Sequence, residues 1–199
     1  MNALEKLIAA NYEGTMSYAE YRELVDQLLE EGKSTGPNQT DALLEYSKMN
    51  VQRMNRWDKH TKLSDETVDF FKNIKHPLHV LIITEGWCGD GAQIVPVVIK
   101  IIEQNPLIQE HIILRDEHLE IMDMFLTDGK SRSVPMFIFI DENGKVVSKF
   151  GPRPKAAIEM MDQLRAEGMD AHDVKEKLHL WYARDKHQAI EHDIIEALS

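Results

Sequence analysis

Apolar side chains recur every three or four positions through the first 75 residues, the spacing that gives an α-helix one apolar face. One stripe covers residues 18–28 and begins just after Ser17, which forms a capping-box pattern with Glu20. A breaker-rich loop at 31–38 separates it from a second stripe, and Ser64 is a candidate cap for a third helix. We therefore expect three or four helices here. The positions expected to face inward are Tyr18, Tyr21, Val25, Leu28, Leu44, Ser47, Val51, Met54, Trp57, Val68, Phe71 and Ile74.

The pattern changes at His76-Pro77, after which short aliphatic runs alternate with helical segments. The run Leu78–Ile83 suits a strand that is buried on both faces. Asn143-Gly144 accepts positive φ angles, so it predicts a hairpin between two later strands. The strands expected are 78–83, 112–114, 136–140 and 146–150, and the helices expected are 94–102, 119–125, 154–167 and 171–198.

The predicted order is β-α-β-α-β-β-α, followed by a highly charged final helix. A crossover helix between the first two strands implies that they are parallel, whereas the hairpin implies an antiparallel pair. We therefore predict an α/β fold in three layers, with a mixed central sheet and helices on both faces. Its expected parts are an N-terminal helical extension at 1–75, the α/β domain at 76–168, and a C-terminal helix at 169–199 packed on it.

Charge and composition limit which kinds of molecule the protein is expected to bind and where in the cell it is expected to act. The formal net charge of −11 is spread over the 199 residues, which disfavours nucleic acid and anionic membrane surfaces. No apolar run has membrane-spanning length, and the first residues contain no apolar signal core. The single cysteine, Cys88, excludes an internal disulfide. These features predict a cytoplasmic protein in which that thiol stays reduced.

The strand at 78–83 leads into Trp87-Cys88-Gly89-Asp90, which resembles the Trp-Cys-Gly-Pro start of the thioredoxin active site. Pro96 follows where thioredoxins carry a proline in the active-site helix, and Ser133-Val134-Pro135-Met136 resembles their cis-proline loop. Gly144 and Gly151 lie close to the family's later glycines. The chain is similar in particular to bacterial thioredoxin-like proteins that have an acidic helical extension and often lack the second cysteine. This resemblance implies the thioredoxin fold.

Cys88 is the candidate nucleophile. A thiolate attacks disulfides, and a helix N-terminus favours the charged form, whereas the nearby carboxylates of Glu85 and Asp90 oppose it. The resemblance shows two departures: Gly91 stands where the resolving cysteine belongs, and Ile82 stands where thioredoxins carry a buried acid. We expect Cys88 to be partly exposed. We also expect a Gly91→Cys variant to form a disulfide with it.

The resemblance implies that Trp87, Gly89, Asp90, Val134 and Pro135 contact the substrate, with a cis bond before Pro135 presenting the Val134 backbone to an extended peptide. The first functional hypothesis is a monothiol thiol-disulfide oxidoreductase. Its mixed disulfides with protein disulfide or thiol substrates would be resolved by an external low-molecular-weight thiol or a protein reductant. It needs no cofactor.

Two alternatives remain. The first is a non-catalytic peptide-binding or protein-binding module that uses the cis-proline groove, with Cys88 incidental. The second is a glutaredoxin-like carrier of glutathione or an iron–sulfur cluster. It ranks lower because glutaredoxins typically have a basic residue before the cysteine and a Gly-Gly pair after the cis-proline, and this chain has neither. The oligomeric state does not follow from the sequence.

Two further groups have simpler interpretations. His187 and Glu191 are one helical turn apart with His192 beside them, but nothing else supports a metal site. We interpret them as part of an exposed charged face. Tyr18, Tyr21 and Trp57 are expected to form the interface between the extension and the main domain rather than a partner surface.

Overall fold

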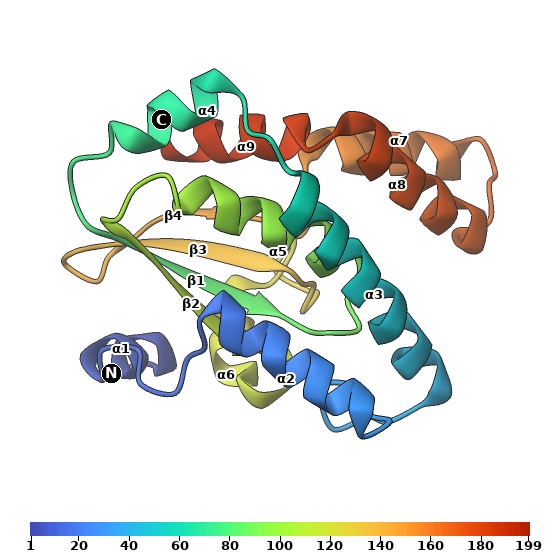
Figure 1. Cartoon of the computed structure of the whole chain (residues 1–199), viewed down its shortest axis with the longest axis horizontal. Coiled ribbons are helices and arrows are strands. Elements are labelled where there is room, and N and C mark those ends of the chain that lie inside the picture. Colours follow the sequence, from blue (N-terminus) through green and yellow to red (C-terminus); the bar gives the residue numbers. More distant parts are fainter.

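A four-stranded mixed sheet forms the centre of the protein. The computed structural model describes all 199 residues, and Figure 1 shows the sheet between helices on both sides. The strands lie in the order β2-β1-β3-β4. Their bounds are Leu78–Thr84 for β1, Ile108–Leu114 for β2, Met136–Asp141 for β3 and Val146–Phe150 for β4.

The strand directions agree with the sequence prediction. β1 and β2 are parallel, with Ile82 opposite Ile112, and the helix α5 (Gly89–Ile102) makes the crossover between them. β3 runs antiparallel to both β1 and β4. The turn between β3 and β4 contains Gly144 at φ +77°, a conformation that glycine adopts without strain. The mixed α/β sheet is therefore confirmed.

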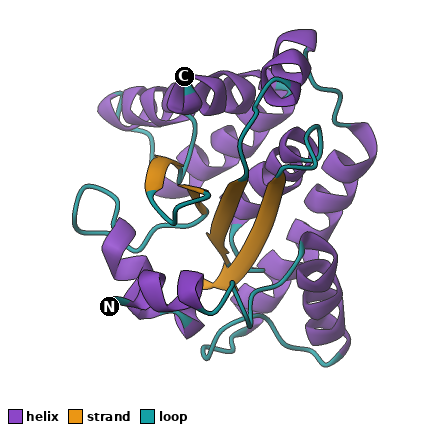
Figure 2. Cartoon of the chain, turned by 90° about the vertical axis from the view of Figure 1, so that its left-hand side faces the viewer, coloured by secondary structure: helices purple, strands orange, loops and turns teal.

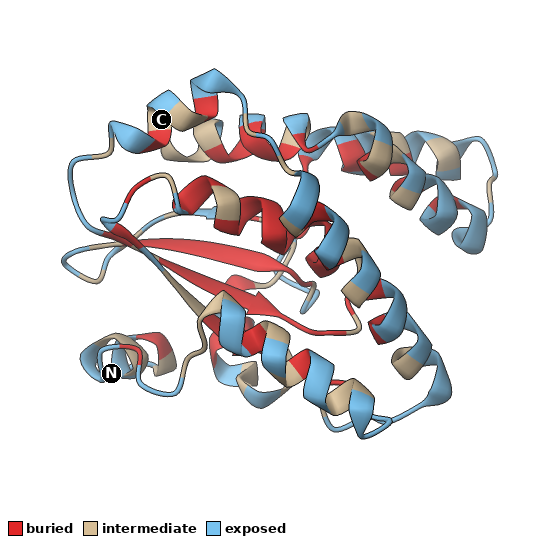
Figure 3. Cartoon of the chain, viewed as in Figure 1, coloured by how far each residue is buried: buried red, intermediate tan, exposed pale blue.

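Successive side chains of a strand point to opposite faces, so the sheet separates two apolar cores. Ile82 and Phe137 belong to the larger core, whereas Ile83 and Met136 belong to the smaller one. All four side chains are fully or almost fully buried. Figure 3 shows β1 and β3 buried along almost their whole length, while the outer faces of α2 and α3 are exposed.

Most helices contribute to the larger core, while α1 and the short α6 cover the smaller one. Figure 2 shows the strands surrounded by helices. No helix is both long and apolar enough to cross a membrane. The helices other than α5 are α1 (Ala3–Ala9), α2 (Tyr18–Glu30), α3 (Asp41–His60), α4 (Asp65–Lys72), α6 (Leu119–Met122), α7 (Lys155–Ala166), α8 (Ala171–Asp185) and α9 (Gln188–Leu198).

The N-terminal helices begin where the capping residues predict. Ser17 and Glu20 form a reciprocal capping box at the start of α2, and the Ser64 side chain accepts the Thr67 N–H at the start of α4. Tyr21 and Trp57 are buried in the larger core, so these helices pack directly on the sheet and its crossover helix.

Two expected helices differ in the structure. The segment 171–198 forms α8 and α9 rather than one helix, because Lys186 and His187 both adopt left-handed backbone conformations, with φ +52° and +63°. The segment 119–125 forms only the single turn of α6 followed by the 3₁₀ turn Asp123–Phe125. Apolar residues continue at a spacing of three through 119–125, whereas the break at Lys186-His187 lies in the polar run 184–188, which contains neither glycine nor proline.

Candidate functional site

Cys88 lies at the N-cap of α5, directly after the turn that follows β1. Its Sγ accepts a hydrogen bond from the Gly91 N–H at 3.3 Å and donates one to the Val134 carbonyl at 3.2 Å. The Val134–Pro135 peptide bond is cis. The structure thus brings together Cys88 and the Ser-Val-Pro loop, two segments that the sequence separates by 46 positions.

The expected exposure of Cys88 is wrong, because only 7% of its surface is accessible. Burial raises the pKa of its thiol to about 12, and the Asp90 carboxylate adds to this effect, while the Gly91 and Asp90 N–H groups and Arg153 act in the opposite direction. The hydrogen bonds give an independent reason for the protonated form. Ionisation would remove the proton donated to the Val134 carbonyl and leave a negative sulfur beside that oxygen.

Asp90 joins the start of α5 to two distant parts of the chain. The Tyr182 hydroxyl of α8 donates to its Oδ1 at 2.8 Å, and Arg153 Nη2 lies 2.6 Å from its Oδ2. Only 7% of the Asp90 surface is exposed. Both carboxylate oxygens therefore have a protein partner, and this side chain anchors α8 against the N-terminus of α5. Sequence reasoning missed Tyr182 and Arg153, for which no local motif gives a signal.

Glu85 is also fully engaged within the protein. The Thr35 hydroxyl donates to one of its carboxylate oxygens, and the Asp116 N–H donates to the other at 2.9 Å. The Thr35 hydroxyl also accepts the Gly86 N–H at 2.9 Å. Burial raises the pKa of the Glu85 carboxyl, although these hydrogen bonds partly offset the effect. Glu85 therefore fixes the turn before Cys88 to the loop after α2.

The positions of Gly91 and Ile82 have clear structural consequences. A Cβ at position 91 would lie 3.4 Å from the Cys88 Cβ, but only 2.7 Å from Thr84 Oγ1. Ile82, at the position where thioredoxins carry a buried acid, is completely buried in the larger core. The strand before Cys88 thus leaves little room for a second cysteine side chain.

Trp87 is half-buried and packs against the smaller core. The Arg115 guanidinium lies over its ring, 4.7 Å from the ring centre, and Arg115 also donates to the Arg132 carbonyl at 3.3 Å. Trp87 and Arg115 therefore lie beside the cis-proline loop. On the opposite side, a Cβ at Gly89 would lie 2.8 Å from the His179 ring, so Gly89 allows α8 to approach α5 closely.

The interpretation of His187 and Glu191 as an exposed face is wrong. Only 8% and 5% of their surfaces are accessible, and His187 Nδ1 lies 2.6 Å from Glu191 Oε1. The Ser64 N–H and hydroxyl donate to Glu191 Oε2 at 2.9 and 2.8 Å. Burial acts to raise the pKa of Glu191, but the hydrogen bonds from His187, Thr67 and Ser64 outweigh it and hold the pKa at about 2. This pair connects α9 to the start of α4.

Two surface groups have side chains spaced closely enough to hold a metal ion. They are Asp170, His172 and Asp173, and His192, Asp193 and Glu196, with ligand atoms within 4.8 Å of one another in each group. Neither group includes a residue of the Cys88 turn or the cis-proline loop. Exposed acidic groups are common without an ion, and Asp193, which is buried, already accepts the Lys155 N–H at 2.7 Å.

Comparisons with known proteins agree on the fold. The family model described as thioredoxin matches residues 36–165. A protein of unknown function from Pseudomonas aeruginosa is similar in structure, with a TM-score of 0.59, 16% identity, and coverage of 92% of this chain and 97% of that chain. An HIV epitope scaffold gives a TM-score of 0.57 and 17% identity, covering 92% and 98% of the two chains. No curated protein matched the sequence.

Proposed function

Because the chain belongs to the thioredoxin family, we propose that it is a binding module of that fold rather than a disulfide reductase. In this proposal the cis-proline loop holds an extended segment of a partner protein, and Cys88 stays a protonated thiol. We expect this role in the cytoplasm, where a single cysteine remains reduced.

The observation that carries the proposal is the environment of the Cys88 sulfur. It is buried, and both its donor and its acceptor capacity are used, by the Val134 carbonyl and the Gly91 N–H. A thiol with a pKa of about 12 is ionised to roughly one part in 10⁵ at pH 7. Since the thiolate is the attacking species in disulfide exchange, such a thiol reacts slowly. Gly91 also leaves no second thiol to resolve a mixed disulfide.

The loop keeps the means to bind an extended chain. The Val134 carbonyl is taken by Cys88, but its N–H makes no hydrogen bond within the protein. An incoming strand that presents a carbonyl to this N–H adds a backbone hydrogen bond, as in other modes of β-strand addition. Trp87 offers an aromatic surface next to it, and Arg115, which is paired with Asp116, lies over the Trp87 ring.

A second candidate function is monothiol exchange, favoured by the position of Sγ at the N-terminus of α5. In that reaction the Cys88 thiolate attacks a substrate disulfide, one substrate sulfur leaves as a thiolate, and a mixed disulfide forms. An external thiol, either a low-molecular-weight thiol or a protein, then attacks the mixed disulfide and restores Cys88. This route requires a conformation in which the hydrogen bond to Val134 is released.

The rate of Cys88 alkylation as a function of pH tests the proposal. We expect native protein to react with iodoacetamide far more slowly than urea-unfolded protein at pH 8, with the native rate rising only at strongly alkaline pH. A native thiol that titrates below neutral pH would refute the binding-module proposal and support exchange. Peptide-array binding provides the second measurement. Cys88→Ala should retain the peptides selected by the wild type, with or without reductant, and loss of all of them would contradict the proposal.

A further inference from the structure

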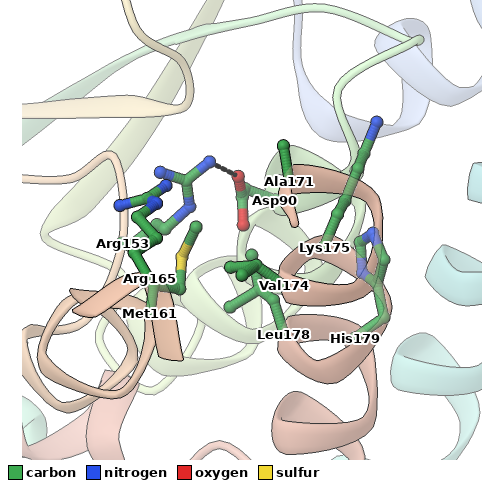
Figure 4. Close-up of a pocket in the computed structure, with 10 residues that line it drawn as sticks. Asp90, Arg153, Met161, Arg165, Ala171, Val174, Lys175, Leu178 and His179 are labelled. Atoms are coloured by element: carbon green, nitrogen blue, oxygen red, sulfur yellow. Dashed lines mark ion pairs between the residues drawn. The ribbon is translucent and has the colours of Figure 1, made fainter. Parts of the chain in front are cut away.

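A separate hollow of about 220 Å³ lies on the other side of Asp90, between the start of α5 and the helices α7 and α8. Figure 4 shows Arg153 and Arg165 together at one end, and Lys175 and His179 of α8 at the other. The apolar side chains of Met161, Val174 and Leu178 complete its wall. The residues of the cis-proline loop are not part of this lining.

The charges around this hollow are unbalanced. Three cationic side chains line it, Arg153, Arg165 and Lys175, against the single carboxylate of Asp90. Asp90 is already bound by Tyr182 and Arg153. The chain as a whole carries a net charge of −11, so this local positive surface runs against the general trend.

Arg165 and Lys175 have only weak alternative partners. Arg165 pairs with Asp162 at 2.9 Å, but both side chains are more than half exposed, and such surface pairs contribute little. The Lys175 ammonium lies 4.0 Å from the centre of the Tyr46 ring and makes no ion pair. Both cations therefore remain able to bind an incoming anion without breaking a buried interaction.

His179 also lines the hollow, and its neighbours set the tautomer of its ring. The Trp57 indole N–H can only donate, so Gln93 accepts it with Oε1 at 2.6 Å and presents its amide nitrogen to His179 Nδ1 at 3.3 Å. The neutral ring then carries its proton on Nε2, the side that faces Gly89. Burial lowers the pKa of His179 to about 4, and the charges of Arg53, Lys175 and Arg153 add to this effect. The positive charges of Lys175 and Arg153, which an anion in the hollow would meet, thus also act on the His179 ring.

We propose that the hollow binds a small molecule through a phosphate or carboxylate group, held by Arg153 and Arg165 with Lys175 and His179 on the facing wall. A guanidinium presents a planar fork that matches either oxyanion. At about 30 Å³ of liquid volume per water, the hollow has room for a phosphate group or a small dicarboxylate. This site goes beyond the proposed peptide-binding loop and does not depend on it.

Titration calorimetry on the full chain at low salt tests this site, with inorganic phosphate and succinate as separate probes. Tighter binding of phosphate would identify a phosphorylated ligand, and tighter binding of succinate a dicarboxylate. We expect Arg165→Gln to weaken binding of the preferred probe about ten-fold or more, because it removes one fork. Arg184→Gln is the matched control: it removes an exposed guanidinium from α8 that does not line the hollow, and it should leave the affinity within about two-fold.

Thermal unfolding shows whether the variants remain folded, and we expect little change because the Arg165–Asp162 pair is exposed. The proposal is overturned if neither probe binds saturably at millimolar concentration. It is also overturned if Arg165→Gln binds as tightly as the wild type, or if Arg184→Gln loses as much affinity as Arg165→Gln. The last result would show that the probes sense only the overall charge of the surface.

Discussion

The space at position 91 makes a specific prediction about a second cysteine in this fold. A Cβ there would lie 3.4 Å from the Cys88 Cβ, close to the separation found in disulfides. The same Cβ would lie 2.7 Å from the Thr84 hydroxyl oxygen, which is closer than van der Waals contact allows. Gly91→Cys, which we expect to form a disulfide with Cys88, would therefore meet a steric obstacle at Thr84. We predict that this variant is strained until Thr84 is shortened.

The expected magnitudes follow from these distances. Overpacking a buried site costs about 1–3 kcal/mol, and for a chain of this size each kcal/mol lowers the Tm by about 2–4 °C. A disulfide between positions 88 and 91 closes a very short loop and contributes only about 2 kcal/mol in the loop-entropy model. In the single variant the strain and the disulfide thus nearly cancel. Thr84→Ala removes the obstructing oxygen, so the double variant should regain most of the stability that strain removes from Gly91→Cys.

The assay is a double-mutant cycle in reductant, with the wild type, Thr84→Ala, Gly91→Cys and the double variant unfolded by urea. We expect Thr84→Ala to be at least about 1 kcal/mol less costly in the Gly91→Cys background than in the wild type. Oxidation with a mild oxidant, followed by thiol counting in denaturant, then measures disulfide formation. It should be more complete in the double variant.

Additive effects in reductant, within about 0.5 kcal/mol, would refute this account of the site. Equal disulfide yields in Gly91→Cys and the double variant would do the same. Either result would mean that Thr84 does not limit the space at position 91. We expect neither cysteine variant to reach the turnover of a dithiol thioredoxin in insulin reduction, since Cys88 remains a protonated thiol.

Three further predictions concern the buried polar contacts. Asp90→Asn removes the negative partner of half-buried Arg153, and this loss should cost about 1–3 kcal/mol in urea unfolding. The same substitution should lower the pKa of the Cys88 thiol and speed its alkylation at pH 8. Unchanged alkylation would contradict the assigned effect of the Asp90 charge. Tyr182→Phe deletes one hydrogen bond to Asp90 and should lower stability by about 1 kcal/mol, measured as a Tm shift, and a Tm equal to that of the wild type would show that this bond adds nothing. The folded pKa of Glu191, about 2, lies below its ordinary value of 4.5, so the stabilising contribution of this carboxylate is present above about pH 4.5 and is lost as the pH falls toward 2. The Tm of Glu191→Gln should therefore fall less steeply over that range than the Tm of the wild type. Parallel Tm profiles would refute this link between Glu191 ionisation and stability.

Local sequence patterns predicted many of the helix starts, strands and turns of the fold. Ser17 with Glu20 and Ser64 each cap a helix where the sequence predicts, because a cap depends on backbone groups only three residues away. The strands at 78–84 and 136–141 follow from their aliphatic runs, and the hairpin follows from Asn143-Gly144. The break at Lys186-His187 did not follow, since neither residue is a typical helix breaker and no glycine or proline lies beside them.

At the candidate site, local sequence accounts for the secondary structure, whereas contacts between distant segments set the chemistry. Trp87-Cys88-Gly89 places a thiol at the start of a helix, and Ser133-Val134-Pro135 marks a cis-proline loop through its resemblance to the loop of thioredoxins. The burial of Cys88 and the two partners of Asp90 depend on segments brought together only by folding. Desolvation and hydrogen bonding control whether a thiol ionises, and both depend on neighbours that are distant in the sequence. The sequence alone could therefore locate the thiol but could not set its protonation state.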